Sequence, residues 1–165
     1  MVTELPVRIE FSLPEGWQAA PPDEVGAPGA AFVAVHPASN DGSANGFTTN
    51  LTIAGEIRHP AVPMATIADE SIHRLDGITE SVSVRGRTDF NPGEAPGMTQ
   101  VLDIEMGQGK QLVQCEIYLP ADDIHDPSRR AVLELVLTCT PEQFAEALPD
   151  FQRFVGTIRP VREGS

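Results

Sequence analysis

Apolar and polar residues alternate along residues 130–139, and a period of two is typical of a β-strand. The opposite side of this stretch holds two further valines, Val132 and Val136, so we expect the strand to be mostly buried. The apolar side consists of Ala131, Leu133, Leu135, Leu137 and Cys139.

The residues that follow this strand predict a helix. Thr140 stands as the N-cap, Pro141 at the first helical position and Gln143 at the third, which together make a capping box. Apolar residues then recur at alternating spacings of four and three, so they form one stripe that must pack on another element. These residues are Phe144, Leu148, Phe151, Val155 and Ile158.

A second helix is expected after Pro63, and Gly77 ends it. Its apolar residues recur at helical spacing and form a stripe wide enough to lie on a sheet. The stripe consists of Met64, Ile67, Ala68, Ser71, Ile72 and Leu75.

Further strands are expected over residues 7–13, 31–36, 47–53, 82–90, 98–106 and 110–119, and residues 19–29 read as a surface loop rich in Pro, Gly and acid. Short connections between neighbouring strands favour antiparallel pairing. The sequence therefore predicts an α+β fold, with a largely antiparallel sheet of about six to seven strands covered by two main helices. We expect residues 1–165 to form a single domain.

The hairpin around Gln108 raises a question of register. A symmetric hairpin would pair Leu102 with Gln114 and would mix core and solvent sides. One extra residue at Gly107 or Gly109 removes this mismatch. We therefore expect a bulge there that pairs Leu102 with Cys115 and Ile104 with Val113.

The charge of the chain limits its partners. Lys and Arg total 11 against 24 Asp and Glu, so the formal net charge is −13. A field of this sign repels phosphate backbones and anionic lipid headgroups, so we expect no nucleic-acid binding. No stretch reaches the roughly 20 apolar residues of a membrane span, and no signal-peptide core is evident, so we expect no membrane insertion and a cytoplasmic location.

Residues that commonly carry chemistry are scattered. The four histidines have no partners at metal-ligand spacing, and the sequence has no HExxH, CxxC, GxGxxG or Walker motif. Both cysteines, Cys115 and Cys139, fall on apolar sides of strands and are expected to be buried free thiols. We therefore predict no catalytic residues, no metal and no cofactor. The histidines are His36, His59, His73 and His125.

One group of carboxylates stands out. In the bulged register, Asp103, Glu105, Glu116 and Glu134 share one side of the sheet. Carboxylates so close could raise one another's pKa values and perform acid–base chemistry. They could also form an acidic docking surface for a basic partner, or simply a solvated face with screened charges.

An apolar pocket is the alternative binding site. Trp17 follows a Pro-Gly turn, where a lone Trp either fills the core under a loop or stacks on a ligand. An apolar ligand could then sit between the sheet and a helix near Trp17, Met64 and Phe151.

Several short sequence segments resemble those of the PsbP-like sandwich superfamily, which includes the bacterial DcrB and LpqN-like proteins. The nearest resemblance is to actinobacterial LpqN-like proteins. These segments are residues 11–17 (FSLPEGW), 50–53 (NLTI) and 135–139 (LVLTC), the last together with the apolar helix that follows it. The resemblance implies an αβα sandwich and a non-catalytic scaffold that binds other proteins, in some branches as a chaperone for secreted effectors. It implies no shared catalytic residues.

These observations favour a protein that is not an enzyme. We expect a protein-binding adaptor or chaperone-like accessory protein, linked to secretion or the cell envelope, whose partner is another protein. The alternative is a carrier of a small apolar ligand or lipid. The sequence is compatible with a monomer or a homodimer.

Overall fold

A computed structural model of the chain describes residues 9–21, 30–39, 47–90, 97–122 and 129–160. Most of these residues belong to one sheet of seven strands in the order β2-β3-β4-β8-β7-β6-β5, and every pair of neighbours is antiparallel. The strands are β2 (Gln18–Ala20), β3 (Phe32–His36), β4 (Thr49–Arg58), β5 (Ser81–Phe90), β6 (Gly97–Gly107), β7 (Lys110–Asp122) and β8 (Arg130–Cys139). The predicted antiparallel α+β architecture is thus confirmed.

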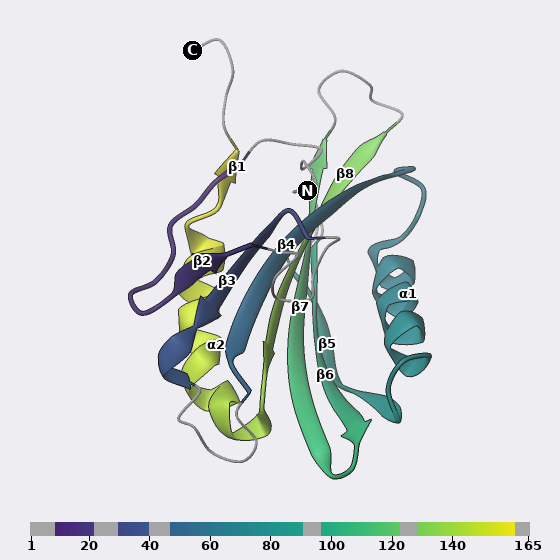
Figure 1. Cartoon of the computed structure of the whole chain (residues 1–165). Coiled ribbons are helices and arrows are strands. Elements are labelled where there is room, and N and C mark those ends of the chain that lie inside the picture. Colours follow the sequence, from purple (N-terminus) through teal and green to yellow (C-terminus); the bar gives the residue numbers. More distant parts are fainter. Residues whose placement is uncertain (1–8, 22–29, 40–46, 91–96, 123–128, 161–165) are drawn as a thin grey trace.

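The two predicted helices are α1 (Met64–Asp76) and α2 (Pro141–Gly156), and they cover opposite faces of the sheet (Figure 1). Gly77 follows the last residue of α1, as expected. The capping box of α2 is also confirmed, since the Thr140 hydroxyl accepts from the Gln143 backbone N–H and the Gln143 side chain accepts from the Thr140 N–H. The result is a three-layer αβα sandwich.

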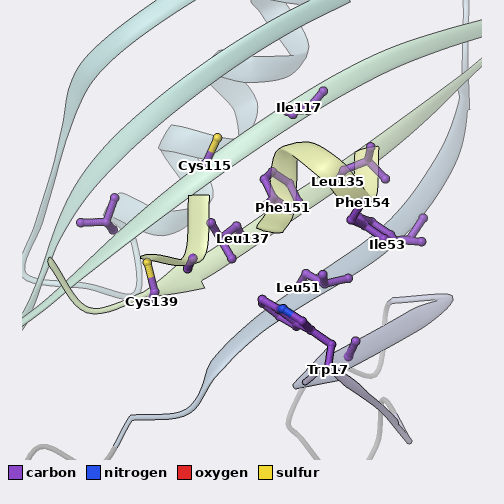
Figure 2. Close-up of a cluster of buried hydrophobic side chains, with 13 residues drawn as sticks. Trp17, Leu51, Ile53, Cys115, Ile117, Leu135, Leu137, Cys139, Phe151 and Phe154 are labelled. Carbon is purple, nitrogen blue, oxygen red and sulfur yellow. The ribbon is translucent and has the colours of Figure 1, made fainter. Parts of the chain in front are cut away.

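The larger core lies between α2 and the centre of the sheet (Figure 2). Strand β8 contributes Leu135 and Leu137 to it, and α2 contributes Phe151 and Phe154, all fully buried. Phe151 belongs to the predicted stripe, whereas Phe154 does not. Both cysteines lie in this core as free thiols, and Cys115 pairs with Leu137 rather than with Cys139.

The smaller core lies under α1, where Met64, Ile67 and Ala68 pack on residues of β6, β7 and β8. Here the buried surface is less apolar, because Ser71, Gln100 and Glu116 are buried among the apolar side chains. The inner face of α1 therefore rests partly on polar groups.

Two details of the prediction were wrong. Gln18–Ala20 forms the edge strand β2, although residues 19–29 were expected to be a loop. In addition, β1 (Ile9–Glu10) pairs with β9 (Arg159–Pro160) in a small separate sheet. The strand expected over residues 7–13 is thus limited to Ile9–Glu10 within the described residues, residues 7 and 8 lying outside them, and it does not join the main sheet. Each short strand depends on a partner elsewhere in the chain for its backbone hydrogen bonds, and local pattern does not reveal that partner. A 3₁₀ turn, η1 (Pro37–Ser39), follows β3.

Candidate functional site

The register of the β6–β7 hairpin decides which side chains meet under α1. Leu102 pairs with Gln114 and Ile104 with Leu112, so the predicted pairing with Cys115 and Val113 is wrong. The strands do shift by one residue, but between Glu105 and Gly107, at the end next to the turn. The prediction assumed that one face of the sheet packs on the core and that the other face is exposed to solvent. Because a helix covers each face, both sides of these strands carry buried apolar residues, with Leu102 and Ile104 on the α1 side and Val113 on the α2 side, so the symmetric pairing is compatible with the core.

This register separates the four predicted carboxylates into two pairs on opposite faces of the sheet. Asp103 lies opposite Val113 and Glu105 opposite Gln111, on the face that α2 covers. By contrast, Glu116 and Glu134 lie on the α1 face, where they pair with Gln100 and Tyr118. The expected single acidic face is therefore a wrong prediction.

Asp103 and Glu105 are partly exposed and have their own partners. Arg85 donates to both oxygens of Asp103, from Nε at 3.1 Å and from Nη2 at 2.5 Å, and its guanidinium lies 5.3 Å from the centre of the Phe144 ring. The hydrogen bond to Asp103 raises the pKa of Arg85. Glu105 accepts from Gln111 at 2.6 Å. Arg85 thus compensates the charge of Asp103, whereas Glu105 is bound by an uncharged amide.

Glu116 is the centre of a buried polar cluster beneath α1, with an exposed fraction of 2%. Its Oε2 accepts from the Ser71 hydroxyl at 2.8 Å. Its Oε1 accepts from Gln100 Nε2 at 2.7 Å and from the Tyr118 hydroxyl at 2.9 Å. Three neutral donors from α1, β6 and β7 therefore converge on one carboxylate, as a buried charge requires.

Gln100 links this carboxylate to the edge of the sheet. Besides Glu116, its amide nitrogen donates to the backbone oxygen of Ala68 in α1 at 3.1 Å. Its amide oxygen accepts from Arg87 twice, at 3.1 and 2.8 Å, and Arg87 also donates to Asp69 of α1 at 2.8 Å. Every hydrogen-bonding atom of the buried Gln100 side chain is thus satisfied.

The opposite flank of α1 is held by Arg58 of β4. This guanidinium makes a two-pronged contact with Glu70, with Nη1 to Oε1 at 2.7 Å and Nη2 to Oε2 at 2.8 Å. The contact raises the pKa of Arg58 and lowers the pKa of Glu70. Arg58 and Arg87 therefore bind α1 on its two flanks. On the side that faces the sheet, Glu116 binds Ser71 of the helix and Gln100 binds the backbone of Ala68.

Glu134 is the second carboxylate of this face and is half-buried. Loss of water on burial, followed by the negative charge of Glu116, raises the pKa of Glu134 from 4.5 to about 7. Arg74 opposes the rise and Glu56 adds to it. Burial and the nearby charge of Glu116 also raise the pKa of Tyr118. Of the four carboxylates predicted to raise one another's pKa values, Glu134 is thus the one whose pKa is raised, and Glu116 contributes to that rise.

The chemistry open to this cluster is limited, because both oxygens of Glu116 are used by internal donors. The thiols are no better placed as nucleophiles, since burial raises the pKa of Cys115 to about 11 and that of Cys139 to about 12. Among the residues that the structure describes, no group of three or more His, Cys, Asp or Glu could hold a metal ion.

The residues of the predicted apolar pocket do not meet. Trp17 and Phe151 belong to the core under α2, and Met64 belongs to the core under α1, so the sheet lies between them. Trp17 is buried and donates from Nε1 to Asp150 at 3.0 Å, which favours the core interpretation. A shallow hollow of about 500 Å³ lies instead on the outer surface of α1, lined by Thr66, Asp69, Glu70, His73 and Arg74.

Sequence reasoning missed most of the polar cluster. Gln100 and Tyr118 sit in strands whose neighbours are apolar, and Ser71 falls within the apolar stripe of α1. A polar residue at a core position is the available signal, because such a residue needs an internal partner. Tyr118 lies two residues from Glu116 in the same strand, whereas the partners Gln100 and Ser71 follow only from the strand register and the packing of α1.

The sheet order and the helix on each face define a PsbP-like sandwich fold. No protein-family sequence model matches the chain, and curated proteins give no significant match. Solved structures do match. LpqN, involved in cell envelope biogenesis of Mycobacterium tuberculosis, aligns with a TM-score of 0.66 at 10% identity over 93% of this chain and 83% of that one.

Two further structures share the fold. CyanoP, the cyanobacterial PsbP of Synechocystis sp. PCC 6803, has a TM-score of 0.59 at 10% identity, over 93% of this chain and 86% of its own. The Ran-binding protein Mog1p of Saccharomyces cerevisiae has a TM-score of 0.55 at 11% identity, over 92% and 89%. These likenesses confirm the predicted resemblance in fold. Within the described residues, no helix has the length and apolarity to cross a membrane.

Proposed function

We propose that this chain is a non-catalytic adaptor or chaperone-like accessory protein that binds another protein. The observation that carries the proposal is the closed state of the polar cluster under α1. Both oxygens of Glu116 and every polar atom of the Gln100 side chain are engaged by neighbouring groups, which leaves them no position for a substrate. The cluster fixes α1 on the sheet and provides a rigid scaffold.

The likenesses in fold support a role in binding. Mog1p is described as a Ran-binding protein, and LpqN as involved in cell envelope biogenesis. By extension, the present chain binds a partner protein that is linked to secretion or the cell envelope. The net charge of −13 favours a partner with a basic surface.

Affinity capture from a lysate of the source organism, at low and at high ionic strength, tests this function. The expected result is one protein that is retained in stoichiometric amount, elutes as salt rises, and captures the chain in the reciprocal experiment. Substitution of the partly exposed pair Asp103→Asn/Glu105→Gln tests its part in docking. The matched control removes two exposed charges from α2, in the variant Glu142→Gln/Glu146→Gln.

Two outcomes would contradict the proposal. One is that no protein binds reproducibly in both directions. The other is that fatty acids or other lipids raise the melting temperature at low and high salt alike, which would favour the carrier function instead. The separation of Trp17 and Phe151 from Met64 gives that carrier function no support.

A further inference from the structure

Strand β5 forms one edge of the sheet, and its first half is well exposed. In the sheet order it bonds only to β6, so half of its backbone N–H and C=O groups point away from any described strand. Ser81 and Ser83 are exposed, as is Val84 with an exposed fraction of 46%. A row of such backbone groups is complementary to one kind of partner, which is another extended chain.

A bulge divides this edge in two. The register between β5 and β6 shifts between Val84 and Gly86, and the extra residue, Arg85, turns its side chain to Asp103. Bulges interrupt pairing with an added strand. The regular segment before the bulge, Ser81–Val84, is therefore the unit that a partner strand could follow.

Apolar side chains gather around this segment. Val82 and Val84 lie on the α1 face, opposite the buried Ile104 and Leu102, whereas Ser81 and Ser83 lie on the other face. An added strand would place every second side chain next to the two valines. The edge thus favours a partner segment that alternates apolar and polar residues.

Two further exposed apolar residues lie beside the start of β5, where Ser81 pairs with Glu105. Ile78, in the loop between α1 and β5, has an exposed fraction of 77%, and Met106, at the end of β6, has 45%. The backbone of Glu80 donates to Glu105 at 2.8 Å, which brings the loop beside the end of β6. Among the described residues, Ile78, Val84 and Met106 are the exposed large hydrophobic side chains.

The charges at this corner select the partner further. Asp76 and Glu80 are exposed at the end of α1 and before β5, while the nearest arginine of β5, Arg85, is bound to Asp103. A second copy of the chain would bring another formal charge of −13 to this surface. A segment of a different protein that carries Lys or Arg fits better.

We propose that the edge of β5 at Ser81–Val84, flanked by Ile78 and Met106, binds an extended segment of a partner protein as an added strand. The segment has apolar residues at every second position and basic residues beside them. This inference rests on the proposed function, because it names the surface and the chemistry through which the partner is bound.

Selection of displayed random peptides on the full chain tests this surface, with Val84→Lys as the counter-selection target. A lysine on an exposed edge opposes strand addition. The expected result is that enriched peptides alternate apolar and polar residues, contain Lys or Arg, and slow amide hydrogen exchange at Ser81–Val84. Val84→Lys should weaken their binding at least tenfold, and Ile78→Lys should do the same.

The matched control is Ala19→Lys, which adds the same charge at an exposed residue of β2, the opposite edge of the sheet. It should bind the peptides as the original chain does. Circular dichroism checks that each variant is folded. The inference is overturned if no peptide is enriched, or if the bound peptides slow amide hydrogen exchange at residues other than Ser81–Val84. It is also overturned if Val84→Lys binds the peptides as well as Ala19→Lys does.

Two additional measurements separate this inference from the proposed function. If the partner captured from lysate is retained by Val84→Lys and Ile78→Lys, the edge proposal fails and the adaptor function stands. If no partner is captured at all, the adaptor function fails. Sedimentation tests whether a second copy of the chain occupies this edge instead. A dimer that the substitution Val84→Lys dissociates would identify that second copy and overturn the proposed partner.

Discussion

Replacement of Glu134 by glutamine tests the electrostatics under α1. Because the pKa of Glu134 is raised from 4.5 to about 7, the folded protein disfavours the ionised form. The difference corresponds to at most about 3.5 kcal/mol, at about 1.4 kcal/mol for each pKa unit. The side chain is half-buried, so solvent screening reduces this value, and we expect the variant to be more stable by about 1–2 kcal/mol at pH 8.5.

The sign of the effect fixes its pH dependence. Below pH 4.5, Glu134 is protonated in the folded and the unfolded chain alike, so it costs no stability. As the pH rises from 4.5 through about 7, the unfolded chain loses this proton first, and the original protein loses stability relative to Glu134→Gln. Above that range the difference is constant.

Urea unfolding at pH 4.5, 6, 7.5 and 8.5 measures this difference, because urea carries no charge. Glu146→Gln, an exposed residue of α2, is the control and should leave the difference near zero at every pH. The reasoning is refuted if Glu134→Gln is no more stable than the original protein at pH 8.5, or if its advantage is the same at pH 4.5.

Three further substitutions probe the packing. Glu116→Ala leaves three buried donors without an acceptor and should lower the free energy of unfolding by about 3 kcal/mol, with faster amide exchange in α1; unchanged urea stability would contradict the role of the cluster. Thr140→Ala removes the cap that binds the Gln143 N–H and should cost about 1 kcal/mol, measured by thermal unfolding. Trp17→Phe keeps the ring in the core but loses the bond to Asp150, and should cost about 1 kcal/mol by the same measurement.

Local sequence signals were sufficient for the main elements of this fold. The capping box at Thr140 and the glycine after Asp76 identify the ends of the helices correctly, because caps depend on neighbouring residues. The strand at 130–139 follows from its period of two. By contrast, Gln18–Ala20 forms a strand because β3 lies beside it, and no local feature encodes that neighbour.

The candidate site was harder to predict, because it depends on register. A shift of one residue exchanges the two faces of a strand, so an error at Gly107 placed Asp103 and Glu116 on the same side. The prediction also assigned Glu116 to the surface, whereas it is buried with three donors. Tyr118 lies two residues from Glu116 on the same side of β7, so the period of two could have identified it. Ser71 and Gln100 come from α1 and β6, and they can be identified only when these elements are assembled.

The position of β8 in the sheet has a consequence for the way the protein is made. This strand joins two halves, β2-β3-β4 and β7-β6-β5, and both halves precede it in the sequence. During translation β4 and β7 therefore wait with free edges until residues 130–139 leave the ribosome, and α2 emerges later still. A nascent chain that stalls before Arg130 exposes the unpaired edges of two long strands and is prone to aggregate.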